Sequence, residues 1–464
     1  MQIFRQYSLL FFVWFLSCSP PKALFENSGS FQLKKNINEL ISSYGPNVNM
    51  GIKILSLKTG ETLYSLNSHK LLMPASNNKL YTCAAALEKL GSDHRFKTSV
   101  LQHGNNLIIR GGGDPDLTIE NLDSLAKITA KKTSIIDTLF VDESLLDSLH
   151  YGPGWMWDEG AWWYAAPISA MSLNDNCIDF HIEPGELGRP AKVKMVPETE
   201  YVRVINQSIT VNESIDNNKF KIDRNWAGRT NMFIISGEVL SSASPDTLQR
   251  NIFDPVFFSG TVFKEQLDKY GVDVNNIVKG TGESDASIIA IHTSDSLQYS
   301  AHNLMYESDN LTAELFTKSM AVSDSTVGNW KDGLRVIKSY LADSASIDTS
   351  LLRLADGSGV SRYNLSSADQ FIKLLYFIYH SDKKDEFIYT LPKSRSNSTL
   401  KDRLVLSEAR VRAKTGHLSG VSCLSGYIFS EQFGPLAFSM LMNGYRGSAK
   451  PYKKLQDKII NFFK

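Results

Sequence analysis

The sequence predicts an α+β protein in which helices cover an antiparallel sheet that is interrupted by an inserted, mostly β region. Residues 48–54 alternate apolar and polar residues as a strand does, the mostly apolar run 436–443 is also expected to be a strand, and apolar residues recur at helical spacing around them. Between 116 and 290 the pattern changes to short strands separated by turns. Helices grouped against an antiparallel sheet indicate an α+β architecture. We therefore expect 28–115 and 291–464 to form one domain, and 116–290 to form an inserted β-rich region of two small domains.

Composition excludes several classes of protein. The chain has 464 residues, of which 42% are hydrophobic and 21% charged, and its formal net charge is zero. These fractions are typical of an ordinary globular protein. The chain lacks the excess of basic residues that would indicate nucleic acid as a partner. The glycine run at 111–113 lacks the spacing of a nucleotide-binding loop. We expect no cofactor and no metal.

The amino terminus has the pattern of an export signal. Arg5 precedes an apolar run from Leu9 to Leu16, which is followed by Ser17 and Cys18. The run is too short to span a bilayer, which takes about 20 apolar residues. Residues 1–17 are predicted to be a signal peptide, so the protein is expected to be exported to the periplasm. Cys18 resembles the lipidated cysteine of bacterial lipoproteins, which would be the only membrane anchor; cleavage nearby without lipidation is the alternative.

The first expected elements run from a helix to a hairpin. Apolar residues at helical spacing predict a helix over 31–44, and alternation predicts a strand over 48–54. Lys58, Thr59 and Gly60 form a turn signal, and 62–66 returns as a second strand. A helix then begins near Ser76, and residues 101–110 are expected to form a single strand.

Aromatic residues and cysteines leave alternatives open in the middle of the chain. The inserted region is expected to hold helices at 122–131 and 257–270, and its stretches 152–155 and 162–164 are rich in aromatic residues. These stretches pack either as a small core or as part of a substrate wall. Cys83, Cys177 and Cys423 lack metal-ligand spacing and form either buried thiols or one bridge.

The last third returns to helices and long strands. Strand 288–292 precedes helices near 311–322 and 330–341, and Ser366 is a plausible cap of a further helix that ends near His380. Strands are expected at 410–414, 424–429 and 436–443, before a final amphipathic helix.

A serine and a lysine lie three residues apart at the start of the helix near Ser76. Residues i and i+3 share a helix face, so the amine of Lys79 can reach the hydroxyl of Ser76. A neutral amine beside a serine would act as its general base, and a neighbouring cation such as Lys414 is one way to lower the pKa of that amine. Alone the pattern is weak, because the same spacing recurs at Ser124 and Ser381.

Two further motifs give this pair a chemical context. Ser308-Asp309-Asn310 precedes a predicted helix, and Lys414-Thr415-Gly416 ends a predicted strand. Ser308 can pass a proton to a leaving amine, and Asn310 can contact both a substrate amide and Lys79. Lys414 and Thr415 can bind a terminal carboxylate. The backbone N–H groups of Ser76 and of His417, which follows Gly416, can stabilise an oxyanion.

The ordered set S-x-x-K, S-D-N and K-T-G is known from penicillin-binding proteins and class A β-lactamases. The sequence resembles the S13 peptidase family of low-molecular-mass class C penicillin-binding proteins, of the penicillin-binding protein 4 type. The long separation of Ser76 and Ser308 is similar to that family, which places extra β-rich domains there. Further similar stretches are Arg110 to Pro115, Asp142 to Ser144, Ala166 to Ala170 and Asp356 to Arg362.

The resemblance implies a serine D-Ala-D-Ala carboxypeptidase or endopeptidase of peptidoglycan, with a penicillin-binding, β-lactamase-like fold. Ser76 would be acylated by the penultimate D-Ala carbonyl of a stem peptide, and β-lactams would acylate the same serine. Asp142 would meet the amine of the stem peptide's diamino acid, unless it only stabilises a turn. His417 departs from the family, which usually has Ser or Thr there. Either the lost hydroxyl weakens the binding of the carboxylate, or the imidazole replaces it with a pH-dependent contact.

Two alternatives remain at the level of the sequence. A β-lactamase of the same fold group would need a deacylation element, and no E-x-x-L-N is present. A catalytically inert peptidoglycan-binding protein would have no need of Ser76, Lys79, Ser308, Asn310 and Lys414 together. The motifs do not distinguish carboxypeptidase from endopeptidase activity, because both present a D-Ala carbonyl to the same serine.

Overall fold

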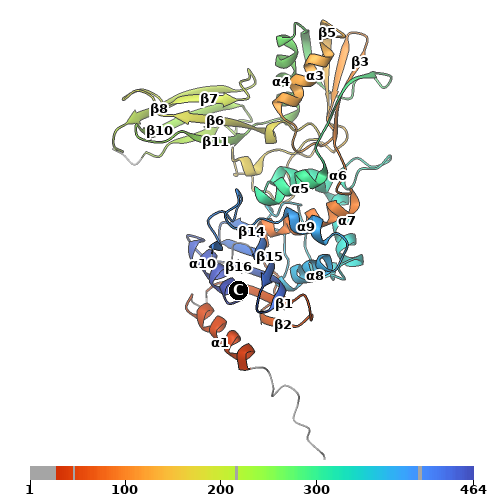
Figure 1. Cartoon of the computed structure of the whole chain (residues 1–464). Helices are drawn as coiled ribbons and strands as arrows, with labels where there is room; N and C mark the ends of the chain where they lie inside the picture. Colours follow the sequence, from red (N-terminus) through yellow and green to blue (C-terminus); the bar gives the residue numbers. More distant parts are fainter. Residues whose placement is uncertain (1–27, 45–46, 215–217, 406–409, 464) are drawn as a thin grey trace, which may run out of the picture. The chain divides into compact units, whose positions relative to one another are not determined.

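The computed structural model describes residues 28–44, 47–214, 218–405 and 410–463 (Figure 1). The predicted signal peptide 1–17 and Cys18 lie outside these residues. The chain divides into two compact units, Met1–Gly45, which contains helix α1 (Ser28–Ser42), and Pro46–Lys464. Across the described ranges, no helix combines the length and the apolar character needed to cross a membrane.

A five-stranded antiparallel sheet in the second unit brings the two ends of the sequence together. Its strand order is β14-β15-β16-β1-β2. The strands are β1 (Asn49–Ser56), β2 (Thr62–Leu66), β14 (Val411–Leu418), β15 (Val421–Ser430) and β16 (Gly434–Asn443). β1 pairs with β16, with Ile52 opposite Met440. The predicted antiparallel sheet is therefore confirmed, and β14 lies at its edge.

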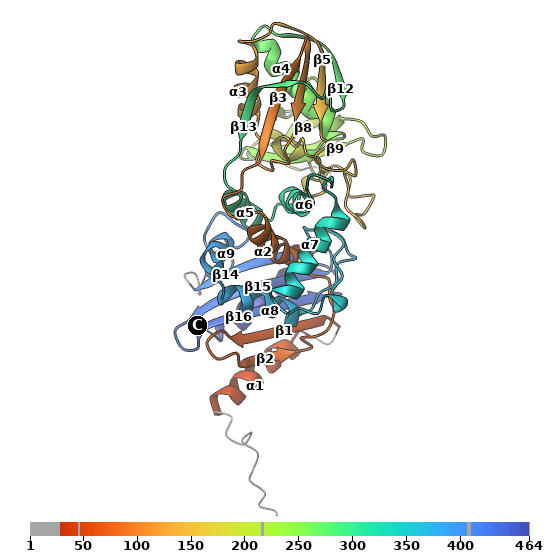
Figure 2. The same cartoon turned by 90° about the vertical axis from the view of Figure 1, so that its right-hand side faces the viewer.

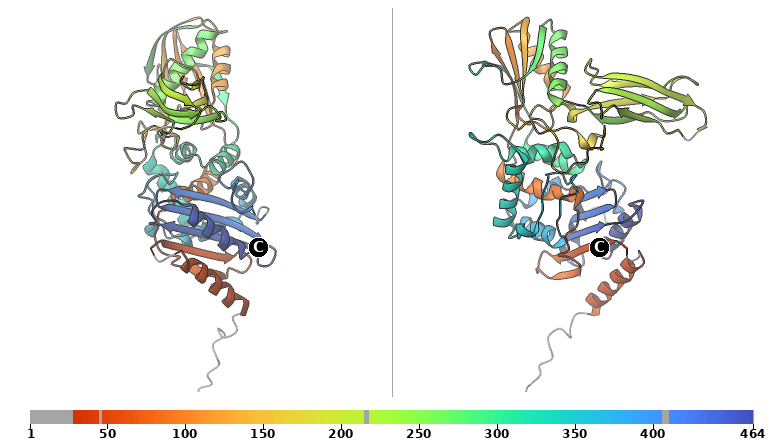
Figure 3. Two further views of the ribbon diagram at one scale, coloured as in Figure 1. Left: turned by 90° about the vertical axis from the view of Figure 1, so that its left-hand side faces the viewer. Right: turned by 180° about the vertical axis from the view of Figure 1, so that it is seen from behind.

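Helices cover both faces of this sheet. Helix α8 (Ala368–Tyr379) packs against β1 and β16, and α10 (Lys450–Asn461) crosses the opposite face against β15 (Figures 2 and 3). The remaining helices on the side of α8 are α2 (Lys79–Lys89), α5 (Leu297–Tyr306), α6 (Asn310–Ser319), α7 (Trp330–Asp343) and α9 (Lys384–Thr390). Ser367, not the predicted Ser366, caps α8, because its hydroxyl accepts the N–H of Gln370 at 3.3 Å. Cys83, Cys177 and Cys423 are buried free thiols, one of the two predicted alternatives.

A second five-stranded sheet has the order β12-β5-β4-β3-β13. Its strands are β3 (Lys97–His103), β4 (Asn106–Arg110), β5 (Ile135–Asp142), β12 (Asp273–Lys279) and β13 (Ser287–Thr293), and it carries helices α3 (Ile119–Thr129) and α4 (Pro255–Lys269). Two predictions are wrong here. Residues 101–110 are not one strand, because Gly104 turns the chain with a positive φ of 55°. The boundaries at 116 and 290 cut through this sheet, so the pairing favours an inserted region from Lys97 to Thr293.

The rest of the inserted region is a pair of three-stranded sheets, β8-β10-β9 and β11-β6-β7. These strands are β6 (Cys177–Glu183), β7 (Lys192–Val196), β8 (Arg203–Val211), β9 (Lys221–Arg224), β10 (Met232–Leu240) and β11 (Asp246–Asn251). The two sheets share a core, in which the rings of Phe180 and Phe233 lie 5.1 Å apart. The predicted β character of this part is confirmed.

A long segment without strands, residues 143–176, joins the inserted region to the helices around α6. The Nε1–H of Trp155 donates to Asp356 Oδ2 at 3.0 Å. The amine of Lys318 on α6 donates to Asp147 Oδ1 at 2.6 Å and to the Leu149 carbonyl at 2.6 Å. Lys318 is itself fully buried against the ring of Trp330. These contacts hold the aromatic segment against the layer that carries the predicted site.

Candidate active site

Ser76 lies on a short 3-10 turn, η2 (Ala75–Asn78), directly before α2. The preceding Ala75 is buried and has a positive φ of 48°, a conformation that costs an L-residue about 1 kcal/mol or more. Lys79 is the first residue of α2, and its Nζ donates to Ser76 Oγ at 3.0 Å. The predicted approach of this amine to this hydroxyl is confirmed.

Lys79 is completely buried and makes two further hydrogen bonds. Its Nζ donates to Asn310 Oδ1 at 2.6 Å and to the Ser358 carbonyl at 2.9 Å. Burial lowers the pKa of the Lys79 amine to about 8, although nearby carboxylates, first Asp309, oppose this. The sequence-based explanation, a lowering by the charge of Lys414, is therefore not the main cause.

The second and third motifs meet beside the serine. Lys414 on β14 is also completely buried, and its Nζ donates to Ser308 Oγ at 2.8 Å. Burial and then the neighbouring Lys79 lower its pKa well below the usual value. Asp309 caps α6 by accepting the N–H groups of Leu311 and Thr312 at 3.1 and 2.7 Å, which fixes the loop that carries Ser308. All three motifs thus form one hydrogen-bonded cluster.

One face of β14 packs against the serine turn, and its edge beyond β15 is not paired with another strand. A Cβ on Gly416 would lie 2.6 Å from the carbonyl oxygen of Pro74, so only glycine lets the strand approach so closely. The N–H of Ala413 donates to Pro392 O at 3.0 Å, away from β15. Since successive N–H groups of a strand point to opposite sides, the N–H of His417 points to the same free edge. This is the position required of the second predicted oxyanion donor.

A buried carboxylate, Glu314, supports the cluster from below and was missed from the sequence. Its oxygens accept the N–H groups of Gly357 and Ser358, both at 2.8 Å, and the Nε1–H of Trp330 at 2.7 Å. Burial, and then repulsion from Asp356, raise the pKa of Glu314 to about 7. Glu314 therefore fixes the loop whose Ser358 carbonyl accepts Lys79. In the sequence it is one of the polar residues of α6, four residues after Asn310 and four before Lys318, a spacing that does not mark it as buried.

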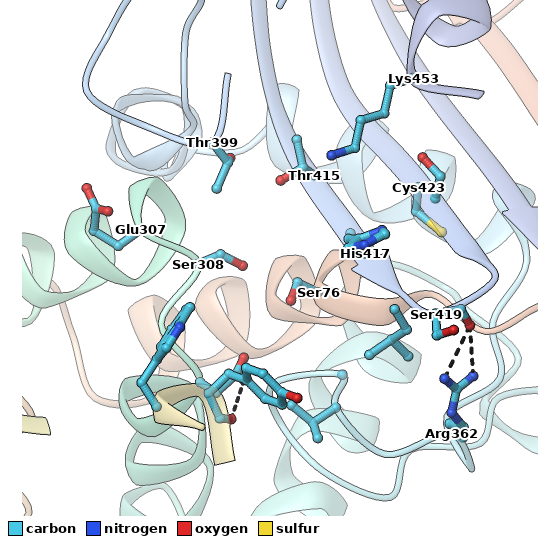
Figure 4. A pocket seen from close by; sticks show the side chains of 18 of the residues that line it. Ser76, Glu307, Ser308, Arg362, Thr399, Thr415, His417, Ser419, Cys423 and Lys453 are labelled. Atoms are coloured by element: carbon cyan, nitrogen blue, oxygen red, sulfur yellow. Dashed lines mark hydrogen bonds between the residues drawn. The ribbon is translucent and has the colours of Figure 1, made fainter. Parts of the chain in front are cut away.

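A pocket of about 640 Å³ opens on this cluster (Figure 4). Its lining includes the predicted Ser76, Ser308, Asn310, Thr415, Gly416 and His417, together with Glu159, Trp163, Tyr164, Glu307, Arg362, Arg403 and Lys453. The Tyr164 hydroxyl donates to Glu159 Oε2 at 2.6 Å, and Asn310 Nδ2 donates to the Tyr164 carbonyl at 2.7 Å. The aromatic segment 162–164 thus contributes to the wall of the pocket, one of its two predicted roles.

Comparison with known proteins identifies the family of this cluster. The model of the D-Ala-D-Ala carboxypeptidase 3 (S13) family matches residues 33–463. The chain belongs to this family. It is therefore a serine-type peptidase, and the predicted resemblance is confirmed.

Individual S13 proteins are similar over most of their length. A D-alanyl-D-alanine carboxypeptidase of Actinomadura sp. (strain R39) is 33% identical over 426 residues, which cover 86% of this chain and 78% of that protein. The crystal structure of penicillin binding protein 4 (DacB) from Haemophilus influenzae superposes with a TM-score of 0.79 at 23% identity, covering 92% of this chain and 98% of that one. The same protein complexed with a β-lactam gives a TM-score of 0.75 at 23% identity, covering 92% and 99%. These structures confirm the predicted fold.

Asp142 is the predicted site residue of this S13 chain that the structure places elsewhere. Its carboxylate is only 1% exposed and does not line the pocket. Oδ2 accepts Arg110 Nε at 2.6 Å, and Oδ1 accepts the N–H of Ser144 at 2.9 Å. Both oxygens are thus used at the end of β5, so the predicted contact with a substrate amine is corrected. The carboxylate that lines the pocket beside Tyr164 is Glu159.

His417, the departure from the S13 pattern, keeps its side chain at the pocket. Its Nδ1 lies 3.1 Å from the Val421 carbonyl, and because a carbonyl only accepts, Nδ1 carries the proton. Burial, and then the charge of Lys453, lower the pKa of the imidazole. The ring is therefore neutral at pH 7.

Proposed function

We propose that Ser76 attacks the penultimate D-Ala carbonyl of peptidoglycan stem peptides, with the terminal D-Ala or a cross-linked peptide as the leaving group. The observation that carries this proposal is the contact of Lys79 with both Ser76 and Asn310. It joins a hydroxyl, an amine of lowered pKa and a substrate-facing amide in one buried cluster. Carboxypeptidase and endopeptidase reactions both fit this site.

Acylation begins when the neutral amine of Lys79 takes the proton of Ser76 and Oγ forms a bond to the carbonyl carbon. The negative charge moves to the carbonyl oxygen, where the N–H groups of Ser76 and His417 can stabilise it by about 3 kcal/mol each. The C–N bond then breaks as the carbonyl re-forms, and the proton that Lys79 took from Ser76 passes through the hydroxyl of Ser308 to the leaving amine. Lys414 supports this transfer because its Nζ donates to Ser308 Oγ at 2.8 Å. Water releases the acyl group in the second half of the reaction.

The pocket lining contains both acidic and basic side chains, which suits a substrate that carries both a positive and a negative group. Glu159 and Glu307 lie in its lining together with Arg362, Arg403 and Lys453. The carboxylate of Glu159, held by Tyr164, suits the amine of a diamino acid in the stem peptide, the role that the sequence assigned to Asp142. Acidic side chains at this place would favour stem peptides whose side-chain amine is free.

β-Lactams are proposed to acylate Ser76, because their ring amide resembles the scissile D-Ala-D-Ala bond. The Haemophilus influenzae penicillin binding protein 4 has been solved in complex with a β-lactam. The β-lactamase alternative requires rapid release of that acyl group. We expect slow release from this chain.

The function is tested by digestion of purified muropeptides, with the products read by mass spectrometry. We expect release of D-Ala from a stem pentapeptide, and acetylation of the diamino-acid amine should raise the KM. Cleavage of cross-linked dimers would add endopeptidase activity. If neither product forms, although fluorescent penicillin labels the protein, the peptidase proposal is wrong. Rapid turnover of penicillin would instead support the β-lactamase alternative.

The pH dependence of acylation reports the proton of Lys79. Its pKa of about 8 lies below the usual 10.5, so the base form is populated only as the pH rises towards 8. The rate constant for acylation by benzylpenicillin should rise about tenfold per unit between pH 6 and 7, and level off above pH 8. Glu314 titrates nearby, with a pKa of about 7, and its charge raises the pKa of Lys79, so in Glu314→Gln the rise should persist but move to lower pH. A flat profile from pH 6 to 8 would exclude Lys79 as the base.

Export and lipidation are proposed from the sequence alone. The apolar run ending at Leu16 supports a signal peptide, and Cys18 supports a lipid anchor. Peptidoglycan as substrate is consistent with a periplasmic location. Incorporation of radiolabelled palmitate into the wild type but not into Cys18→Ala is expected, and equal labelling would refute the anchor.

A further inference from the structure

One side of the pocket carries positive charges from Arg403 and from Lys453 on α10. Arg403 is occupied by protein groups: its Nη2 pairs with Asp457 Oδ1 at 2.7 Å and donates to Gln456 Oε1 at 3.0 Å. Within the ranges that the structure describes, the amine of Lys453 makes no hydrogen bond and no ion pair. In the view of Figure 4 this amine points towards Thr415 and His417, and all three residues line the pocket. Lys453 thus presents an uncompensated charge to the pocket.

An ammonium group next to a guanidinium group is unfavourable unless an anion joins them. Burial, and then the charge of Arg403, lower the pKa of Lys453, and Asp457 opposes this shift only in part. Asp457 already pairs with Arg403. Glu307, an acid of the same pocket, lies on the other side of Ser76 in Figure 4. The group that would neutralise Lys453 is therefore an anion that enters the pocket.

The neighbours of Lys453 show which part of a ligand would meet it. Thr415 and His417 are two residues apart on β14, so their side chains lie on the same face of the strand. The imidazole of His417 is neutral at pH 7 and donates Nδ1–H to the Val421 carbonyl. A carboxylate at this end of the pocket would find the hydroxyl of Thr415 there, but no charge from His417.

We propose that Lys453 binds the carboxylate of the leaving D-residue, and the equivalent carboxylate of β-lactams, and so makes the enzyme prefer substrates in which this carboxylate is free. The inference rests on the proposed function, since it assigns a partner within the same pocket. Lys453 forms no bond in the reaction and takes no proton. Its contribution is to bind the substrate and to orient the scissile bond relative to Ser76.

Acylation by benzylpenicillin and by its uncharged methyl ester tests this role directly on Ser76. In the wild type the acid should acylate faster than the ester. In Lys453→Met the second-order rate constant for the acid should fall about tenfold, the cost of one charged hydrogen bond, while that for the ester stays within twofold. Lys453→Arg should retain the preference for the acid. Lys454→Met is the matched control, because Lys454 is the next residue of α10 and does not line the pocket.

The same variants are compared on a D-Ala-D-Ala peptide with a free C-terminal carboxylate and on its C-terminal amide. In Lys453→Met, the KM for the peptide with the free carboxylate should rise with little change in kcat. An equal fall for acid and ester, or an unchanged acid preference in Lys453→Met, would overturn the proposal. These outcomes differ from failure of the proposed function, in which the wild type is acylated by penicillin but releases no D-Ala. Matched thermal unfolding midpoints would exclude misfolding as the cause.

Discussion

Replacement of Ser76 by alanine abolishes the covalent penicillin adduct and lowers kcat/KM for D-Ala release by about 10⁴-fold or more, as expected for removal of a nucleophile. The loss should not come from unfolding. Ser76 is half-buried, and Lys79 supplies the hydrogen bond to its hydroxyl. Lys79 retains Asn310 and Ser358 as partners in the variant. Intact-protein mass spectrometry after incubation with benzylpenicillin measures the result.

Ser308→Ala is the matched control for this experiment. It removes the hydroxyl that Lys414 holds at 2.8 Å and leaves the Ser76–Lys79 pair in place. We expect slower acylation in this variant, but a complete adduct after long incubation. A full adduct in Ser76→Ala would assign the nucleophile to another residue. No adduct at all in Ser308→Ala would show that Ser308 is required for acylation itself.

Replacement of Gly359 by alanine should both destabilise the protein and slow acylation. Gly359 is buried with a φ of 90°, and a Cβ there would overlap the carbonyl oxygen of Ala75, the residue before the nucleophile. Backbone strain and overpacking together predict a loss of about 3 to 5 kcal/mol. Because Ala75 would have to move, the acylation rate constant should fall at least about tenfold, a cost of about 1.4 kcal/mol. Thermal unfolding and penicillin acylation measure the two effects.

Gly434→Ala separates strain from contact. Gly434 also has a positive φ, 71°, but no heavy atom lies within 4 Å of its added Cβ. It should lose only the strain energy of about 1 to 2 kcal/mol and acylate at the wild-type rate. Equal effects at the two glycines would mean that the approach of Gly359 to the serine turn does not position Ser76.

The short motifs were predictable because each depends on local spacing. The contact between Ser76 and Lys79 follows from the geometry of a single helical turn. The position of Asp309 directly before α6 likewise follows from local sequence. The alternation of 48–54 likewise predicted β1. Such features follow from the period of a helix or strand and need no distant contact.

The boundaries of the inserted region were not predictable in the same way. β4 pairs in parallel with β5 across helix α3, and β3 pairs with β13 from the far end of the insertion. Hydrophobic alternation indicates that a strand exists, but it does not identify its partner. The sequence therefore indicated strands within 101–110 and at 288–292 but not that they pair in one sheet of the inserted region.

The same limit applies to acidic side chains. Asp142 and Glu159 both lie in or beside loops of the inserted region, and neither has a spacing that distinguishes a buried ion pair from a pocket residue. Tertiary contacts place Asp142 on Arg110 and Glu159 on Tyr164. Glu314 and Lys453 likewise depend on packing, since one is buried under the loop 356–362 and the other reaches the pocket from the last helix.

Residue types and local spacing were sufficient to identify the family, the nucleophile motif and the order of the elements. Which charges reach the pocket, and how Lys79 loses its proton, depend instead on contacts between residues far apart in the chain. Burial in the assembled core, rather than the neighbouring Lys414, is the main cause of the lowered pKa of Lys79. Burial is a property of the whole fold, since the groups that surround Lys79 come from Asn310 and Ser358, far from it in the chain.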